Sequence, residues 1–132
     1  MKIAIICFQE YDEMEHIYYD ISGVNERKWL RWIGGEFIGF TDMSAKKVVN
    51  AEKNVKNTIK QLKLELKLAE KNIERNKNNT KEDWEKLDKK YRKETLGMSG
   101  YFILPSEEWE EEKNAPRRIK QEIKKAEEVL CL

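Results

Sequence analysis

The sequence predicts an α+β fold, in which a small N-terminal antiparallel sheet of four to five strands packs with a long helical hairpin and a C-terminal helix. Two observations lead to this fold. Short β-branched and aromatic runs fill residues 1–42, and from residue 44 onward apolar residues recur every three or four positions, the helical period. The 132 residues suit a single domain, with the sheet in 1–42, the hairpin in 43–97, and a strand plus helix in 101–131.

Four segments in the N-terminal part have the composition of strands. Residues 2–8 (KIAIICF) and 16–21 (HIYYDI) are the first two. Residues 28–33 and 36–41 flank Gly34 and Gly35, which can adopt the positive φ of a two-residue hairpin turn. Such a hairpin would pair Trp32 with Phe37 and Trp29 with Phe40 across the strands.

The predicted long helix covers residues 44–75 and carries an apolar seam of heptad type. Thr80 is the expected N-cap of a second helix, 80–96, which would fold back on the first and end at Gly97. Because this second helix is half as long as the first, part of the seam is left for the C-terminal helix or for a second subunit. The seam favours a homo-oligomer and consists of Val48, Val55, Ile59, Leu62, Leu66 and Ile73.

After the hairpin, residues 101–104 (YFIL) predict a fifth strand or a buried extended segment. A helix can begin at Pro116, since proline is favoured in the first helical turn. The C-terminal helix is amphipathic, with Ile119, Ile123, Ala126 and Leu130 on one side.

Residue types and their spacing argue against most enzymes and cofactors. His16 is the single histidine, and Cys7 and Cys131 form no CxxC pair, so the sequence predicts no metal site, no cofactor and no catalytic residues. The acidic residues near the second strand show no spacing that a metal-dependent nuclease or phosphoesterase requires, and that activity is the last of three alternatives. The apolar start is too short for a signal peptide or a membrane span, which predicts a cytoplasmic protein with no membrane partner.

Aromatic and basic residues alternate around the predicted glycine hairpin. Positive charge beside an aromatic face is the combination that nucleotide and single-strand recognition uses. The alternative is that the C-terminal helix covers this face of the sheet. The candidate ligand- or partner-binding residues are Arg27, Lys28, Trp29, Arg31, Trp32, Phe37 and Phe40.

Charge is distributed unevenly along the chain. Residues 1–42 hold four Lys/Arg against eight acids, whereas residues 43–100 hold sixteen against nine. Beside the seam the long helix carries a lysine ridge that suits a phosphate backbone, an acidic segment of the same chain or plain solvation. The lysine ridge consists of Lys46, Lys53, Lys56, Lys60, Lys63 and Lys67.

These features favour a small non-enzymatic interaction protein, an inhibitor or adaptor that docks on a larger protein. The alternative is a protein that binds or sequesters nucleotides or nucleic acid through the aromatic-basic hairpin and the lysine ridge. The Lys-, Asn-, Ile- and Glu-rich composition resembles that of accessory proteins of AT-rich bacteria and their phages. That resemblance, which is one of composition, implies a phage accessory protein that acts on a host system.

Overall fold

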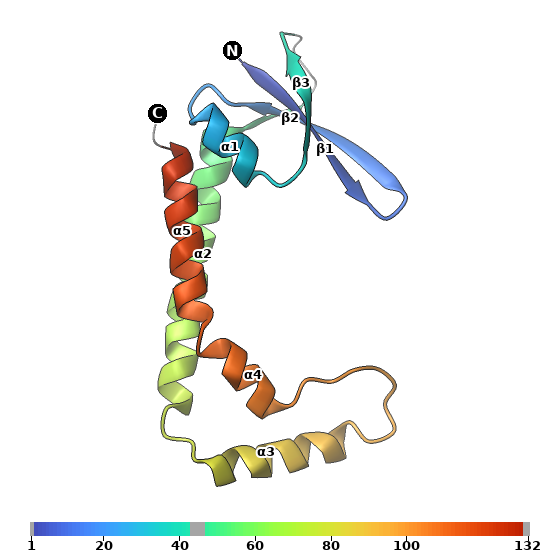
Figure 1. Cartoon of the computed structure of the whole chain (residues 1–132), viewed down its shortest axis with the longest axis vertical. Helices are drawn as coiled ribbons and strands as arrows, with labels where there is room; N and C mark the ends of the chain where they lie inside the picture. The colour runs from blue at the N-terminus through green and yellow to red at the C-terminus, as the bar shows by residue number, and fades with distance from the viewer. Residues whose placement is uncertain (1, 43–46, 131–132) are drawn as a thin grey trace. The chain divides into compact units, whose positions relative to one another are not determined.

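A computed structural model describes residues 2–42 and 47–130. The elements are, in chain order, β1 (Ile3–Glu10), β2 (Glu13–Asp20), α1 (Glu26–Trp32), β3 (Glu36–Thr41), β4 (Val48–Asn50), α2 (Ala51–Asn76), α3 (Lys81–Glu94), α4 (Pro105–Glu112) and α5 (Ala115–Leu130) (Figure 1). The predicted α+β class is confirmed. The chain forms two compact units: unit 1 holds Met1–Leu62 with Gln121–Leu132, and unit 2 holds Lys63–Lys120. The helices α2 and α5 contribute to both units.

The sheet of unit 1 has the strand order β3-β1-β2-β4 and is mixed, which corrects the prediction of a purely antiparallel sheet. β1 is antiparallel to β2 and β3, whereas β4 is parallel to β2. β4 consists of residues that were expected at the start of the long helix. Asn50 explains the difference, because its Oδ1 accepts a hydrogen bond from the Lys53 N–H (3.0 Å) and so starts α2 at Ala51.

Residues 28–32 lie in helix α1 instead of a strand and Ile33 is the C-cap of this helix, so the prediction of a Gly34-Gly35 hairpin is wrong. Asn25 starts the helix, since its Oδ1 accepts a hydrogen bond from the Lys28 N–H (3.1 Å). Gly34, at φ 81°, follows the C-cap of α1, a common place for a left-handed glycine. The predicted partners of Phe37 and Phe40 are also wrong, because β3 pairs with β1.

We expect replacement of the α1 cap, Asn25→Ala, to lower the free energy of unfolding by about 1 kcal/mol, because the first turn of α1 loses its side-chain acceptor. Urea denaturation followed by circular dichroism measures the change. Asn57→Ala is the matched control, since Asn57 is exposed inside α2, where alanine is the better helix former. Equal losses in the two variants would contradict a capping role for Asn25.

The core of unit 1 lies between the sheet, α1 and the paired halves of α2 and α5, which run side by side (Figure 1). Trp29 of α1 is fully buried and meets Tyr19 of β2 edge-on, with ring centroids 5.0 Å apart. Burial, and secondly the charge of Glu15, raises the pKa of the Tyr19 hydroxyl. The helices add Val55, Ile59, Ile123, Ala126 and Val129, all buried. The N-terminal half of the predicted seam is therefore covered within the chain.

In unit 2, α3 packs against α4 and not back along α2, which corrects the predicted helical hairpin. Trp84 and Trp109 stack with ring centroids 5.5 Å apart. Ser106 donates to Asp88 from its backbone N–H (3.0 Å) and from its hydroxyl (2.7 Å). One aromatic stack and two hydrogen bonds thus join α3 to α4. Among the described residues, no ring contact or side-chain hydrogen bond joins α3 to α2.

Thr80 caps α3 as predicted, in a capping box with Asp83. The Asp83 N–H donates to the Thr80 hydroxyl (3.2 Å), and the Thr80 N–H donates to the Asp83 carboxylate (2.9 Å). The backbone hydrogen bond from Thr80 is the main cause that lowers the pKa of Asp83. The side chains of Thr80 and Asp83 thus define the start of α3.

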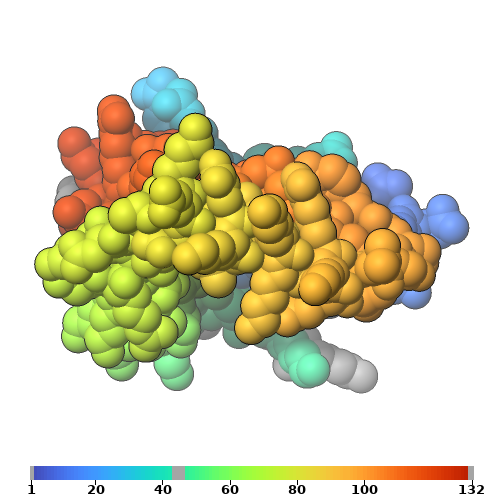
Figure 2. Space-filling view, turned by 90° about the horizontal axis from the view of Figure 1, so that it is seen from below, coloured from blue at the N-terminus to red at the C-terminus, as the bar shows by residue number. Residues whose placement is uncertain are grey.

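Residues 101–104 form neither a strand nor a buried segment, so that prediction is wrong. They belong to an irregular connection between α3 and α4 in which Leu96 and Tyr101 are exposed. Figure 2 shows this connection, in orange, beside α3 on the surface of unit 2. Pro105 ends the connection at the first residue of α4.

Candidate functional site

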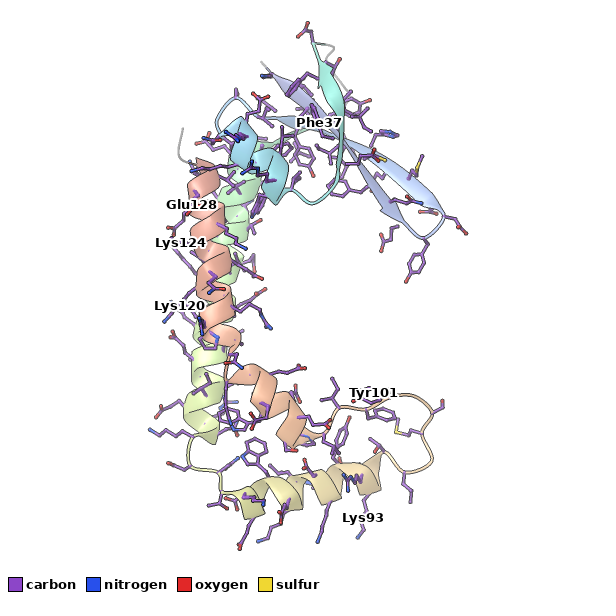
Figure 3. The ribbon with its side chains drawn as sticks, in the orientation of Figure 1. Phe37, Lys93, Tyr101, Lys120, Lys124 and Glu128 are labelled. Carbon is purple, nitrogen blue, oxygen red and sulfur yellow. The ribbon has the colours of Figure 1, made fainter. Side chains whose placement is uncertain are left out.

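Helices α1 and α5 form an open groove in unit 1, which we call the α1–α5 groove. Its volume is about 360 Å³. Glu128 and Lys124 lie one turn apart on α5 (Figure 3), but Lys124 is not part of the lining. The groove is lined by Lys28, Arg31, Trp32, Lys125, Glu128 and Val129.

The α1–α5 groove holds an excess of positive charge, with three cations against one carboxylate. In the described parts of the chain, ion pairs form at Lys2–Glu26, Lys56–Glu52, Lys77–Glu74 and Lys113–Glu110, and none includes a cation of the groove. All three cations are exposed to solvent. Both walls are held in place, because the Asn25 N–H at the start of α1 donates to the carbonyl of Val129 on α5 (2.8 Å).

The second surface is one edge of the sheet, which we call the β3 edge and define as Phe37, Ile38 and Phe40. Their exposed fractions are 41%, 52% and 43%. An irregularity in the β1–β3 register places Phe37 opposite Ile6 and Phe40 opposite Ala4. The two phenylalanines thereby share one face of the sheet, with ring centroids 4.9 Å apart. Phe37 is seen on β3 in Figure 3.

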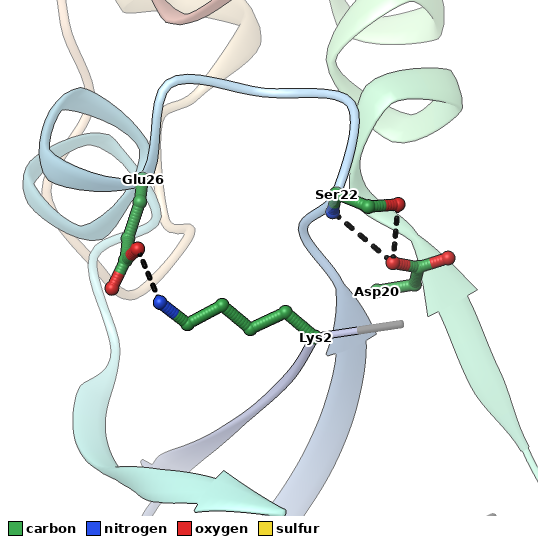
Figure 4. A network of polar contacts seen from close by, with 4 residues as sticks. All are labelled: Lys2, Asp20, Ser22 and Glu26. Atoms are coloured by element: carbon green, nitrogen blue, oxygen red, sulfur yellow. Dashed lines mark hydrogen bonds and ion pairs between the residues drawn. The ribbon is translucent and has the colours of Figure 1, made fainter. Parts of the chain in front are cut away.

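Lys2 flanks the β3 edge but is already engaged. Its Nζ lies 4.4 Å from the centroid of the Phe40 ring. The same Nζ lies 2.7 Å from a carboxylate oxygen of Glu26 on α1 (Figure 4). In the same region, the Ser22 hydroxyl and backbone N–H both donate to Asp20 (2.8 and 3.1 Å). The β3 edge is therefore mainly apolar; Glu26 balances the charge of Lys2, and Glu36 is exposed at the start of β3.

The structure brings together some of the candidate residues that the sequence suggested. Lys28, Arg31 and Trp32 line one groove, whereas Trp29 is buried in the core and is left out of the site. Arg27 is exposed on α1 outside the groove lining. Phe37 and Phe40 lie on the β3 edge.

Sequence reasoning missed the contribution of α5 to the groove. Lys125 and Glu128 are three residues apart and therefore share a face of α5, a spacing that is visible in the sequence. Nothing in the sequence pattern predicts that this face lies beside α1. Ile38 was not among the candidate residues; it lies at the register irregularity, between Phe37 opposite Ile6 and Gly39 opposite Ile5.

The described residues of the lysine ridge are exposed on α2, and the C-terminal part of the predicted seam is half-buried. Lys53, Lys56, Lys60, Lys63 and Lys67 are exposed on α2, and Lys56 pairs with Glu52 (2.9 Å). Lys46 lies outside the described residues. Of the predicted seam, Val48 belongs to β4, whereas Leu62, Leu66 and Ile73 are half-buried on α2.

Cys7 of β1 lies between His16 of β2 and Glu36 of β3, each directly opposite it in the ladder. Cys7 is buried and His16 is exposed. Across residues 2–42 and 47–130, no group of three or more His, Cys, Asp or Glu side chains is placed to hold a metal ion. Within the same ranges, the helices are all too short or too polar to cross a membrane.

Comparison with protein families, with curated proteins and with solved structures found no match to this chain.

Proposed function

We propose that the protein is a non-enzymatic interaction protein that docks on a larger protein through the β3 edge. In this proposal, an extended segment of the partner pairs with β3 and adds a strand to the sheet. An edge strand offers backbone groups to a pairing chain, and its side chains select which chain pairs. The role would be that of an inhibitor or adaptor, including a phage accessory protein that acts on a host system.

The observation that carries the proposal is the exposure of three large apolar side chains on an edge strand. Phe37, Ile38 and Phe40 keep 41–52% of their surface in contact with water. On the neighbouring strand, Ile3, Ala4 and Ile6 are buried. Burial of exposed apolar surface favours association, so these three side chains on one edge strand give a partner an apolar contact on unit 1.

The chemistry of the β3 edge also favours a particular partner. Glu26 balances the charge of Lys2, so Phe37, Ile38 and Phe40 offer apolar and aromatic contacts, and Glu36 is the exposed charge at the start of β3. A mostly apolar extended segment fits this surface better than an acidic or basic one. The exposed Leu96 and Tyr101 in unit 2 offer a second apolar contact to the same class of partner.

We expect Ile38→Lys to weaken partner capture at least about tenfold, because the new charge must be desolvated when a strand pairs with β3. Affinity capture with quantitative mass spectrometry would compare wild type and variant. The matched control is Leu64→Lys, which places the same charge at a residue of α2 that is 54% exposed. The proposal requires one captured protein that the β3 variant loses and the control retains.

Two results would overturn the proposal. In the first, Ile38→Lys and Leu64→Lys capture the same proteins in equal amounts. In the second, light scattering shows that the wild type self-associates and that Ile38→Lys is monomeric, with no larger partner captured. That second result would assign the β3 edge to another copy of this chain. Circular dichroism of both variants ensures that a loss of capture is not a loss of folding.

A further inference from the structure

We propose that the α1–α5 groove is a second and independent binding site of unit 1, and that its ligand is a mononucleotide. This inference goes beyond docking at the β3 edge, because the two surfaces share no residue. The juxtaposition that carries it is a tryptophan, three cations and one carboxylate, which two helices bring to one groove.

The cations supply the site for the phosphate groups. Lys28 and Arg31 lie one turn apart on α1, and Lys125 faces them from α5. The guanidinium of Arg31 can bind a phosphate through two parallel hydrogen bonds, and the two ammonium groups add point charges. Among the described residues these three have no ion-pair partner, so a phosphate would not have to displace a carboxylate.

Trp32 supplies an aromatic surface for the base. It is half-buried at the groove, whereas its neighbour Trp29 is fixed in the core. A half-buried indole keeps an apolar face available at low entropic cost, because packing already restricts its rotamers. Stacking on an aromatic side chain tolerates any base, so this contact selects nucleotides as a class.

Glu128 distinguishes a mononucleotide from a nucleic-acid strand. Its carboxylate lies in the same groove as the cations and can accept a hydrogen bond from a ribose hydroxyl or a base amino group. The same negative charge repels a phosphate chain that continues through the groove. The volume of about 360 Å³ also lies at the lower end of the range of small-ligand sites, roughly 300–1,000 Å³.

The test uses the full chain and N-methylanthraniloyl-ATP, whose fluorescence reports binding directly, with unlabelled ATP as competitor. We expect saturable binding that weakens about tenfold or more in Arg31→Glu, because the variant reverses a charge in the groove. Arg27→Glu is the matched control, since Arg27 is exposed on the same helix but lies outside the groove lining. Its affinity should stay within about twofold of wild type at matched ionic strength.

A second variant separates base stacking from charge. Trp32→Leu should weaken ATP binding about tenfold and leave the competition by pyrophosphate unchanged, because leucine removes the ring and no charge. Ile38→Lys should bind the nucleotide as wild type does, which keeps failure of this site distinct from failure of the β3 edge. Circular dichroism verifies the fold of each variant.

Three outcomes would overturn the inference. The first is the absence of saturable nucleotide binding at low salt. The second is an equal loss in Arg27→Glu and Arg31→Glu, which would mean unspecific attraction to a basic helix. The third is a single-stranded oligonucleotide that displaces the labelled nucleotide at much lower concentration than ATP, which would assign the groove to nucleic acid.

Discussion

Replacement of Trp29 by alanine is expected to lower the free energy of unfolding of unit 1 by about 3–5 kcal/mol. Trp29 of α1 is fully buried, and its ring contacts that of Tyr19 in the sheet. Removal of the indole leaves a cavity that surrounding strands can fill only in part. Small domains have a total stability of about 5–15 kcal/mol, so the loss is a large share of it. Urea denaturation followed by circular dichroism measures the effect.

Two further variants define what Trp29 contributes. Trp32→Ala removes a half-buried indole from the same helix and should lower the free energy of unfolding by less than Trp29→Ala. Trp29→Phe should recover much of the lost stability, because the Nε1 of Trp29 is buried without a hydrogen-bond partner in the described structure. If Trp29→Ala and Trp32→Ala are equally destabilised, Trp29 does not lie in the core.

The second large effect is expected where α2 and α5 pair in unit 1. Ile59→Ala should lower the free energy of unfolding by about 2–5 kcal/mol, since Ile59 is only 8% exposed. Leu64→Ala is the matched control, because Leu64 lies on the same helix but is 54% exposed. Its effect should stay within about 0.5 kcal/mol.

A comparison of the wild type with Ile59→Ala also tests whether the seam belongs to an oligomer interface. If α5 covers Ile59, the urea midpoint of the wild type and of Ile59→Ala does not depend on protein concentration. A midpoint that rises with concentration in the wild type and no longer does so in Ile59→Ala would assign this part of the seam to a second subunit.

The fold was predictable from the sequence where a segment carried one unambiguous local signal. The β-branched run of β1 and the Thr80 cap of α3 are such segments, and both are found within two residues of their predicted positions. Residues 28–33 were ambiguous, since Trp29 and Ile33 are four apart and suit a helix as well as a strand. The two helix starts that were not predicted correctly are those of α1 and α2. They are set by the caps Asn25 and Asn50, and asparagine is a common N-cap residue.

The candidate sites were less predictable because they depend on contacts between distant parts of the chain. Local pattern identified Lys28, Arg31 and Trp32, but the approach of Lys125 and Glu128 follows from how α5 packs on α1. Likewise, Phe37 and Phe40 are an odd number of residues apart, which places them on opposite faces of a regular strand. The register irregularity in β3 brings them to one face, and its local signal in the sequence is Gly39, because a glycine inside a strand often marks a bulge.

The order in which the two units are synthesised has a consequence for folding in the cell. Unit 2 is one continuous stretch of chain, whereas unit 1 is completed by residues that follow unit 2. Ile123, Ala126 and Val129 supply part of the core of unit 1, and Val129 accepts the hydrogen bond from Asn25. During synthesis, all residues of unit 2 are therefore present before unit 1 is complete. Until α5 is synthesised, the apolar residues of the sheet that α5 covers stay exposed.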